Sequence, residues 1–192
     1  MWWARLLNNL ISLYSGAAAA TSYESIATVT VGAGGSSTIT FSSIPSTYKH
    51  LQIRLIGRTA VASVNGAVRI AINSDATAAN YRSHYLQGSG SAASAGTSAG
   101  STSGIQDMAY ILGNSAGASS FGAAVIDILD YTDTNKYKTV RSLSGGDNNG
   151  SGYVSFASGL WLSTSAVTSL VLEGNGSNFN QYSSFALYGV KG

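Results

Sequence analysis

The sequence contains no cysteine, a single proline and very little charge. Without cysteine there can be no disulfide framework and no thiolate metal site, so stability must come from packing and backbone hydrogen bonds. Lys, Arg, Asp and Glu together make up 9% of the chain, against about 25% in an average soluble domain. The 10 basic residues are scattered. This argues against nucleic-acid binding, because a nucleic-acid-binding face concentrates positive charge.

The residues that are present describe a folded chain with a neutral surface. Hydrophobic residues make up 44% of the 192 residues and aromatic residues 10%, which is too apolar for a disordered chain. The length suits one domain with a sizeable core. Most of the remaining residues are Ser, Thr, Asn and Gly. A surface of hydroxyl and amide groups of this kind suits packing against neighbouring proteins.

An apolar segment, residues 1–14, opens the sequence. Its large side chains recur at spacings of three and four residues, which predicts a short amphipathic helix, and residues 16–20 would connect it to the rest of the chain. We expect this segment to be a docking or oligomerisation element that binds a partner groove or copies of itself. The anchor residues expected in this helix are Trp2, Trp3, Leu6, Leu7, Leu10, Ile11, Leu13 and Tyr14.

Two other interpretations of this segment fit less well. Asn8 and Asn9 interrupt the apolar run, which argues against the hydrophobic region of a cleaved signal peptide. A membrane-spanning helix needs about 20 mostly apolar residues in succession, and this segment is shorter. We therefore predict no membrane span.

Beyond residue 24 the hydrophobic pattern alternates with a period of two, which is typical of strands that bury one face. Leu51, Ile53 and Leu55 show it most clearly, because polar residues stand between them. Clusters of Gly, Asn, Asp and Ser separate the strands as turns. The expected strands are 26–31, 38–42, 50–58, 68–73, 81–86, 105–112, 123–131, 137–143, 153–162, 167–172 and 185–190. The sequence thus predicts an all-β domain over residues 21–192, an antiparallel two-sheet β-sandwich of jelly-roll type.

One segment lacks this alternation. Residues 88–104 consist only of Ser, Gly, Ala and Thr. Side chains this small cannot offset the entropy of ordering the chain by burial. We expect a long exposed loop here, held in place by a neighbouring subunit if it is ordered.

The polar residues form no recognisable catalytic motif. His50 and His84 fall at outward positions of expected strands, and the sequence has no Gly-x-Ser-x-Gly nucleophile turn between a strand and a helix. We expect both histidines to be solvated, and we predict that the protein is not an enzyme and has no cofactor.

A calcium site is the lesser alternative for the acidic residues. Residues 130–135 could supply several oxygens but lack the ligand spacing of a dedicated calcium loop. Asp and Asn in such a segment are expected to form turns. We therefore predict no metal ion.

The aromatic residues have two possible roles. Exposed Tyr and Trp side chains could stack on sugars or lie in an interface, whereas buried ones fill a core. We expect Phe41, Phe156, Trp161, Phe185 and Tyr188 to fill the core. Tyr81, Tyr85, Tyr110 and Tyr153 could instead serve an interface.

Three segments carry a resemblance to a known family: Tyr23–Val31 (YESIATVTV), Ile39–Arg54 (ITFSSIPSTYKHLQIR) and Phe185–Val190 (FALYGV). Together they resemble a β-sandwich module in structural proteins of tailed bacteriophages, notably those of cyanobacterial and other aquatic hosts. The resemblance covers about residues 23–190. It implies a non-enzymatic virion component, present in many copies and often trimeric, and it supplies no catalytic residues. The resemblance does not imply which component this is; we expect it on the outer surface of the particle.

Within this class we expect a capsid decoration (cement) protein, which binds the major capsid protein or another virion protein. The alternative is a tail-fibre or receptor-binding module, whose loops 147–152 and 174–180 would recognise a host surface glycan. A secreted carbohydrate-binding domain or hydrolase lies outside the class.

Overall fold

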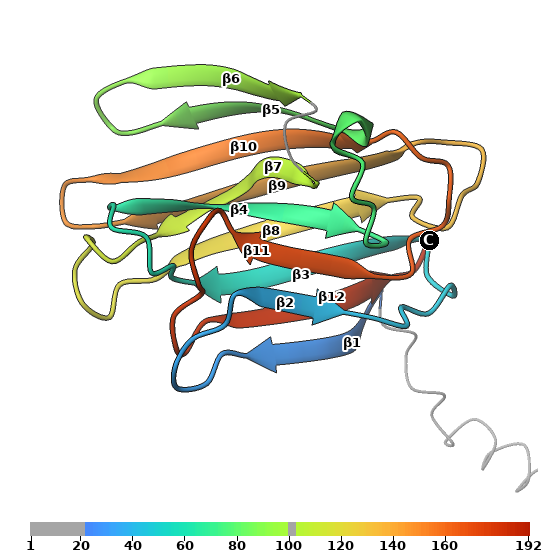
Figure 1. Cartoon of the computed structure of the whole chain (residues 1–192), viewed down its shortest axis with the longest axis horizontal. Helices are drawn as coiled ribbons and strands as arrows, with labels where there is room; N and C mark the ends of the chain where they lie inside the picture. Colours follow the sequence, from blue (N-terminus) through green and yellow to red (C-terminus); the bar gives the residue numbers. More distant parts are fainter. Residues whose placement is uncertain (1–21, 100–102) are drawn as a thin grey trace, which may run out of the picture.

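The computed structural model describes residues 22–99 and 103–192, and it confirms the predicted all-β fold with two antiparallel sheets (Figure 1). A single turn of 3-10 helix, η1 (Ala78–Asn80), precedes the fifth strand. The strands are β1 (Tyr23–Thr30), β2 (Thr38–Phe41), β3 (His50–Gly57), β4 (Asn65–Ile72), β5 (Tyr81–Gly88), β6 (Ala93–Ala99), β7 (Ile105–Leu112), β8 (Gly122–Leu129), β9 (Lys138–Asp147), β10 (Gly152–Trp161), β11 (Leu170–Gly174) and β12 (Ser184–Val190).

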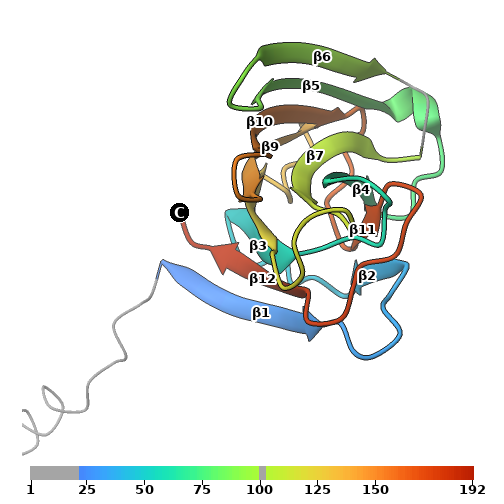
Figure 2. The same ribbon diagram turned by 90° about the vertical axis from the view of Figure 1, so that its left-hand side faces the viewer.

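The two sheets differ in size. The larger has eight strands in the order β1-β12-β3-β8-β9-β10-β5-β6, and the smaller has four in the order β2-β11-β4-β7. The smaller sheet packs on one face of the larger, so that β7 lies against β9 and β10 (Figure 2). The opposite face of the larger sheet, called the outer face below, has no described part of the chain on it.

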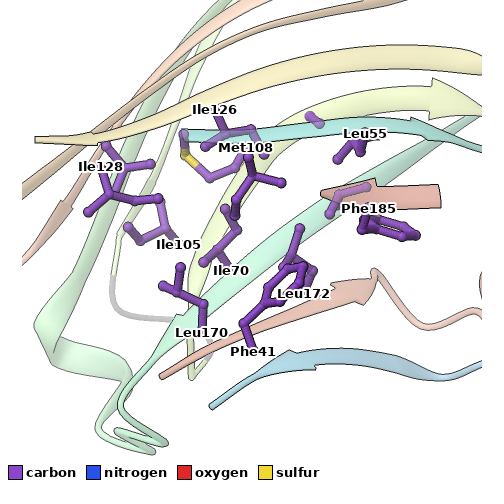
Figure 3. Packing of buried hydrophobic residues seen from close by; sticks show 14 of the residues in the cluster. Phe41, Leu55, Ile70, Ile105, Met108, Ile126, Ile128, Leu170, Leu172 and Phe185 are labelled. Carbon is purple, nitrogen blue, oxygen red and sulfur yellow. The ribbon is translucent and has the colours of Figure 1, made fainter. Parts of the chain in front are cut away.

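The core lies between the sheets and follows the alternation of the sequence. Leu51, Ile53 and Leu55 of β3 are buried, as predicted. The rings of Phe179 and Phe185 meet edge to face, with centroids 4.8 Å apart. Figure 3 shows the side chains of both sheets that meet there, among them Phe41, Ile70, Ile126, Ile128, Leu170 and Leu172.

The expected N-terminal helix and its connector fall in residues 1–21, outside the described residues. Its role as a docking element and its anchor residues therefore stay predictions. Within the part of the chain that the structure describes, no helix has the length and apolar character to cross a membrane.

The expectation of a long loop at residues 88–104 is wrong. Ala93–Ala99 form β6, which pairs antiparallel with β5 and places Ala95 opposite Leu86. The small side chains allow this pairing, because the Tyr85 ring lies where a Cβ of Gly96 would stand. Backbone hydrogen bonds to β5 therefore order a strand that buries little apolar surface of its own.

Arg58 is a buried cation that organises a loop. Its guanidinium donates hydrogen bonds to the carbonyl oxygens of Gly117 (2.7 Å), Ser120 (2.9 Å), Ala116 (2.9 Å) and Asn114 (3.3 Å). The side chain is 8% exposed. One residue at the end of β3 thus fixes the β7–β8 loop, residues 113–121, through four backbone acceptors.

Lys138 plays the same part at the other end of the sandwich. Its ammonium is fully buried and donates to the carbonyl oxygens of Asp133, Lys136 and Thr164 at 2.7, 2.8 and 3.0 Å. Burial lowers the pKa of Lys138. The three carbonyl partners use all three of its protons.

Asp75 joins the β4–β5 connection to β10. Its carboxylate accepts hydrogen bonds from the backbone N–H of Thr77, from Asn80 Nδ2 and from Trp161 Nε1, each at 2.8 Å. Partial burial raises the pKa of Asp75, but the hydrogen bonds from these donors lower it by a larger amount, so that the pKa is about 2. The folded state therefore prefers the ionised carboxylate.

We expect Asp75→Asn to lower stability at pH 7 and to have little effect at pH 2. The pKa in the folded state is below the unfolded value of about 3.9, so this carboxylate stabilises the fold above pH 4 and loses that effect as the pH falls toward 2. Allowing for partial exposure, the difference at pH 7 is on the order of 1 kcal/mol. Thermal unfolding at both pH values measures it, with Asp147→Asn as an exposed control. An equal deficit at pH 7 and pH 2 would contradict this prediction.

Candidate functional site

The outer face of the eight-stranded sheet carries a line of exposed apolar side chains across four adjacent strands. These residues, called the apolar row, are Val125 (β8), Leu143 (β9), Phe156 (β10) and Leu86 (β5). Each is directly opposite the next in the strand register, and they are between 39% and 57% exposed. Val154 and Ile56, also on the outer face, are 57% and 52% exposed. Contiguous exposed apolar side chains of this kind mark interaction surfaces.

The apolar row exists because the middle parts of β9 and β10, residues 142–144 and 155–159, are turned with their small residues inward. Ser142, Ser144 and Ser155 are buried between the sheets, while Leu143 and Phe156 point to solvent. The reason is the close approach of β7, since a Cβ at Gly159 would collide with Ile105 and Met108 of that strand. The Tyr110 backbone N–H also donates to Ser144 Oγ, at 2.9 Å. Small inward residues are therefore required, and the large apolar ones are left outside.

Two aromatic side chains expected in the core are on the outer face instead. Phe156 is 52% exposed, and Tyr188 is half-buried beneath the Arg54 guanidinium, whose carbon lies 5.2 Å from the ring centroid. For Phe156 the expectation failed because apolar residues occupy both faces of β10, so that the pattern does not distinguish the inner face from the outer face. Phe41, Trp161 and Phe185 are buried, as predicted.

The four tyrosines left open by the sequence fall into two groups. Tyr81 is buried and its hydroxyl donates to the backbone carbonyls of Ile72 and Asp75. Tyr85, Tyr110 and Tyr153 are half-buried and form a line of ring contacts, with centroid distances of 6.2 and 6.1 Å. All four are inward-facing and contribute nothing to the outer face.

A polar line borders the apolar row on one side. The polar line crosses the strands two residue positions away from the apolar row. In the order of the strands, from β3 to β6, it consists of Gln52, Asp127, Arg141, Ser158, His84 and Thr97. Within this line Gln52 Nε2 donates a hydrogen bond of 2.8 Å to Asp127 Oδ1. The Oε1 atom of Gln52 accepts another, also of 2.8 Å, from Arg54 Nε. An apolar centre with a polar border is the arrangement of a protein–protein interface.

The two histidines lie far apart in the sheet order and in different settings. His50 Nδ1 accepts a hydrogen bond of 2.9 Å from the Asp130 backbone N–H. His84 is exposed in the polar line, between Ser158 and Thr97. In this arrangement His50 supports a turn and His84 is solvated.

The acidic segment considered for calcium is occupied by lysine side chains. Lys136 Nζ lies 2.7 Å from Asp130 Oδ2 and 3.2 Å from Asp133 Oδ2, and Lys49 Nζ lies 2.9 Å from Asp130 Oδ1. These two lysines hold the pKa of Asp130 at about 2. Over residues 22–99 and 103–192, no three His, Cys, Asp or Glu side chains are grouped as metal ligands.

The loops considered for glycan binding gather at one end of the sandwich, on the left in Figure 1. The β7–β8 loop joins them, since the Gly117 N–H donates to Asn148 Oδ1 at 2.6 Å and Asn180 Nδ2 donates to Asn114 Oδ1 at 2.7 Å. A hollow of about 460 Å³ there is lined in part by Phe121 and residues 178–182. Tyr182 beside it is 70% exposed, with a φ of 71°.

Comparisons with known proteins add little to this description. No protein-family profile matches the sequence, and no curated protein matches it. Among solved structures, the Caenorhabditis elegans galectin LEC-6 is similar at 8% identity with a TM-score of 0.27, over 86% of this chain and 96% of the galectin.

Proposed function

We propose that this chain is a non-enzymatic structural protein of a tailed-phage virion, a capsid decoration protein on the outside of the particle. It binds the major capsid protein or another virion protein through protein–protein contacts. The observation that carries this proposal is the apolar row, because a folded domain keeps four large apolar side chains in solvent while burying serines behind them. The sequence resemblance to phage virion modules supplies the biological setting.

The size of the apolar row indicates a weak individual site. Complete burial of a Val, Leu or Phe side chain stabilises by about 1.5–3 kcal/mol. Because these four are already partly covered, docking them would contribute about 3–6 kcal/mol in total. Association itself costs about 4–15 kcal/mol. A second contact is therefore needed, and the apolar N-terminal segment is suited to provide it.

A decoration protein can act through many weak contacts at once. A protein that binds only the assembled lattice stabilises that lattice by mass action. Attachment through two linked elements, here the apolar row and the N-terminal segment, raises the overall affinity well above that of either one. The low charge of the chain suits such crowding, because neighbouring copies do not repel one another.

The copy number on purified particles tests the proposal directly. A decoration protein is expected in about as many copies as capsid hexamers or major capsid proteins, measured by quantitative mass spectrometry of whole particles. Complete absence of the chain from particles, or turnover of a sugar polymer by the isolated protein, would overturn the proposal.

The second candidate is a tail-fibre or receptor-binding module that recognises a host surface glycan. The observation in its favour is the loop end of the sandwich, where Tyr182 and the hollow beside it lie opposite the end at which β1 begins (Figure 1). An N-terminal attachment and a distal binding site would then be at opposite ends. A few dozen copies per particle, together with glycan binding that Tyr182→Ala removes, would favour this candidate over decoration.

We expect Trp3→Ala to weaken attachment to particles about 30-fold, because truncating an aromatic anchor in an interface costs about 2 kcal/mol. The control is Thr40→Ala, which removes an exposed side chain of the small sheet, away from the apolar row and the polar line, and should change affinity less than about twofold. Co-sedimentation of labelled protein with particles stripped of it measures both. Equal affinities for the two variants would show that the N-terminal segment is not part of the interface.

A further inference from the structure

Among the described residues, the large sheet ends at β6. β6 is the last strand in the sheet order, with β5 on one side of it, and the β5–β6 hairpin projects beyond the small sheet at the top of Figure 1. Its residues carry no charge and no proline, and its pairing with β5 has no bulge. Strands at sheet edges usually carry charged residues, prolines or bulges, because an unprotected edge pairs readily with another strand.

The opposite edge of the same sheet is protected. The pairing of β1 with β12 is interrupted by a bulge between Ser25 and Ala27. Glu24 of β1 forms an ion pair with Lys191 and accepts a hydrogen bond of 3.0 Å from the Tyr48 hydroxyl. A bulge and an inward charge both discourage pairing with another chain. Of the two edge strands of the large sheet, β6 is therefore the one that lacks these features.

The sequence of β6, Ala-Ser-Ala-Gly-Thr-Ser-Ala, is nearly the same read in either direction from Gly96. If two copies of this strand pair antiparallel with Gly96 opposite Gly96, every residue except Ala95 and Thr97 faces an identical residue. The opposing pairs are Ala93 with Ala99, Ser94 with Ser98, and Ala95 with Thr97. This symmetry is what a twofold interface requires, because the same surface must complement itself.

We propose that β6 pairs antiparallel with β6 of a second copy of this chain, about a twofold axis at Gly96, so that the two large sheets become one. Residues directly opposite in an antiparallel pair project to the same face. The outer faces of both copies, with their apolar rows, therefore lie on the same side of the joined sheet. This pairing follows from the strand alone and does not depend on the proposed function.

The position of Gly96 fits this arrangement. The Tyr85 ring fills the place of a Gly96 side chain on the inner face of the sheet, so the two residues at the axis bring no side chains that could clash with each other there. Leu86, at the end of the apolar row, lies opposite Ala95 on the outer face. The dimer would therefore bring the two apolar rows toward each other across a short stretch of small side chains, forming one broader surface.

Two cysteine variants test the register. The chain has no cysteine of its own, so Ala93→Cys and Ala99→Cys each introduce a single thiol. In the proposed pair, residue 93 of one copy is opposite residue 99 of the other, with Cα atoms about 4.5–5.5 Å apart, within the range for a disulfide. Two copies of residue 93 would be about 20 Å apart, as would two copies of residue 99.

Mild oxidation of an equimolar mixture of the two variants should therefore give a disulfide-linked dimer, whereas either variant alone should stay monomeric on a non-reducing gel. Circular dichroism confirms that both variants fold. Crosslinking of one variant by itself to the same extent as the mixture would overturn the register, and failure of the mixture to crosslink would overturn the pairing.

The mass in solution tests the association without any thiol. The wild-type protein should show twice its chain mass of 19.6 kDa in sedimentation equilibrium at micromolar concentration. Ala95→Lys, which places a charge on the edge strand, should weaken the dimer at least tenfold, and Thr28→Lys on β1 should leave it unchanged. A wild-type monomer, or a trimer that persists in Ala95→Lys, would contradict the proposal.

Discussion

Replacing Phe156 with aspartate is expected to weaken attachment to particles at least about 100-fold and to leave the fold intact. Phe156 lies inside the apolar row, between Leu143 and Leu86. Docking the variant would bury an unpaired carboxylate against apolar side chains, and it would also lose the contacts of the ring. Because the side chain is 52% exposed in the free protein, we expect the free energy of unfolding to change by less than about 1 kcal/mol.

Binding to stripped particles and urea unfolding measure the two effects separately. The matched control is Thr40→Asp, which places the same charge on an exposed strand position of the small sheet, away from the apolar row. This control should bind like the wild type. Wild-type affinity of Phe156→Asp, in a protein that folds normally, would show that the apolar row is not the surface that meets the particle.

Arg58→Met is expected to have the largest effect on stability, a loss of about 3 kcal/mol. Methionine keeps most of the apolar volume of the side chain but donates no hydrogen bond. Four carbonyl oxygens of the β7–β8 loop then lose their donors. A buried acceptor left without a partner costs about 1–3 kcal/mol, and entry of water at this loop end of the sandwich offsets part of the total.

Equilibrium unfolding in urea measures this loss. Arg82→Met is the control, because Arg82 donates to two nearby carbonyls, those of Ala79 and Tyr81, and is partly exposed. It should change stability by less than about 0.5 kcal/mol. Hydrogen exchange should also show faster opening of residues 113–121 in Arg58→Met than in the control. Equal stabilities for the two variants would show that the loop does not depend on this guanidinium.

The strands were largely predictable because most of them bury one face and expose the other. The expected strand 105–112 coincides with β7, and residues 50–58 contain all of β3. Boundaries shifted where loop contacts replace strand pairing. The expected strand at residue 167 begins only at Leu170, because the Val167 N–H donates to the carbonyl of Tyr131 in another loop. Contacts of this kind between distant segments leave no local pattern in the sequence.

β6 and the position of Phe156 in the apolar row could not be predicted, because neither β6 nor β10 shows a clear alternation of apolar and polar residues. In β6 all side chains are small, so there is no alternation of apolar and polar residues to detect. In β10 both faces carry apolar residues, and only the position of β7 decides that Phe156 is outside and Ala157 inside. The candidate site is therefore a product of tertiary packing. The N-terminal anchor, which the sequence did indicate, stays a prediction.

The position of β12 sets a condition on how the protein is made. This strand follows all the other described strands in the sequence, yet it lies between β1 and β3 inside the large sheet. Until β12 has left the ribosome, β1 has no partner strand and β3 is paired on one side only. The strands from β8 to β6 in the sheet order can assemble earlier, because all of them leave the ribosome before residue 184. Nascent chains that stall just short of β12 would therefore expose two strand edges and become substrates for chaperones or for aggregation.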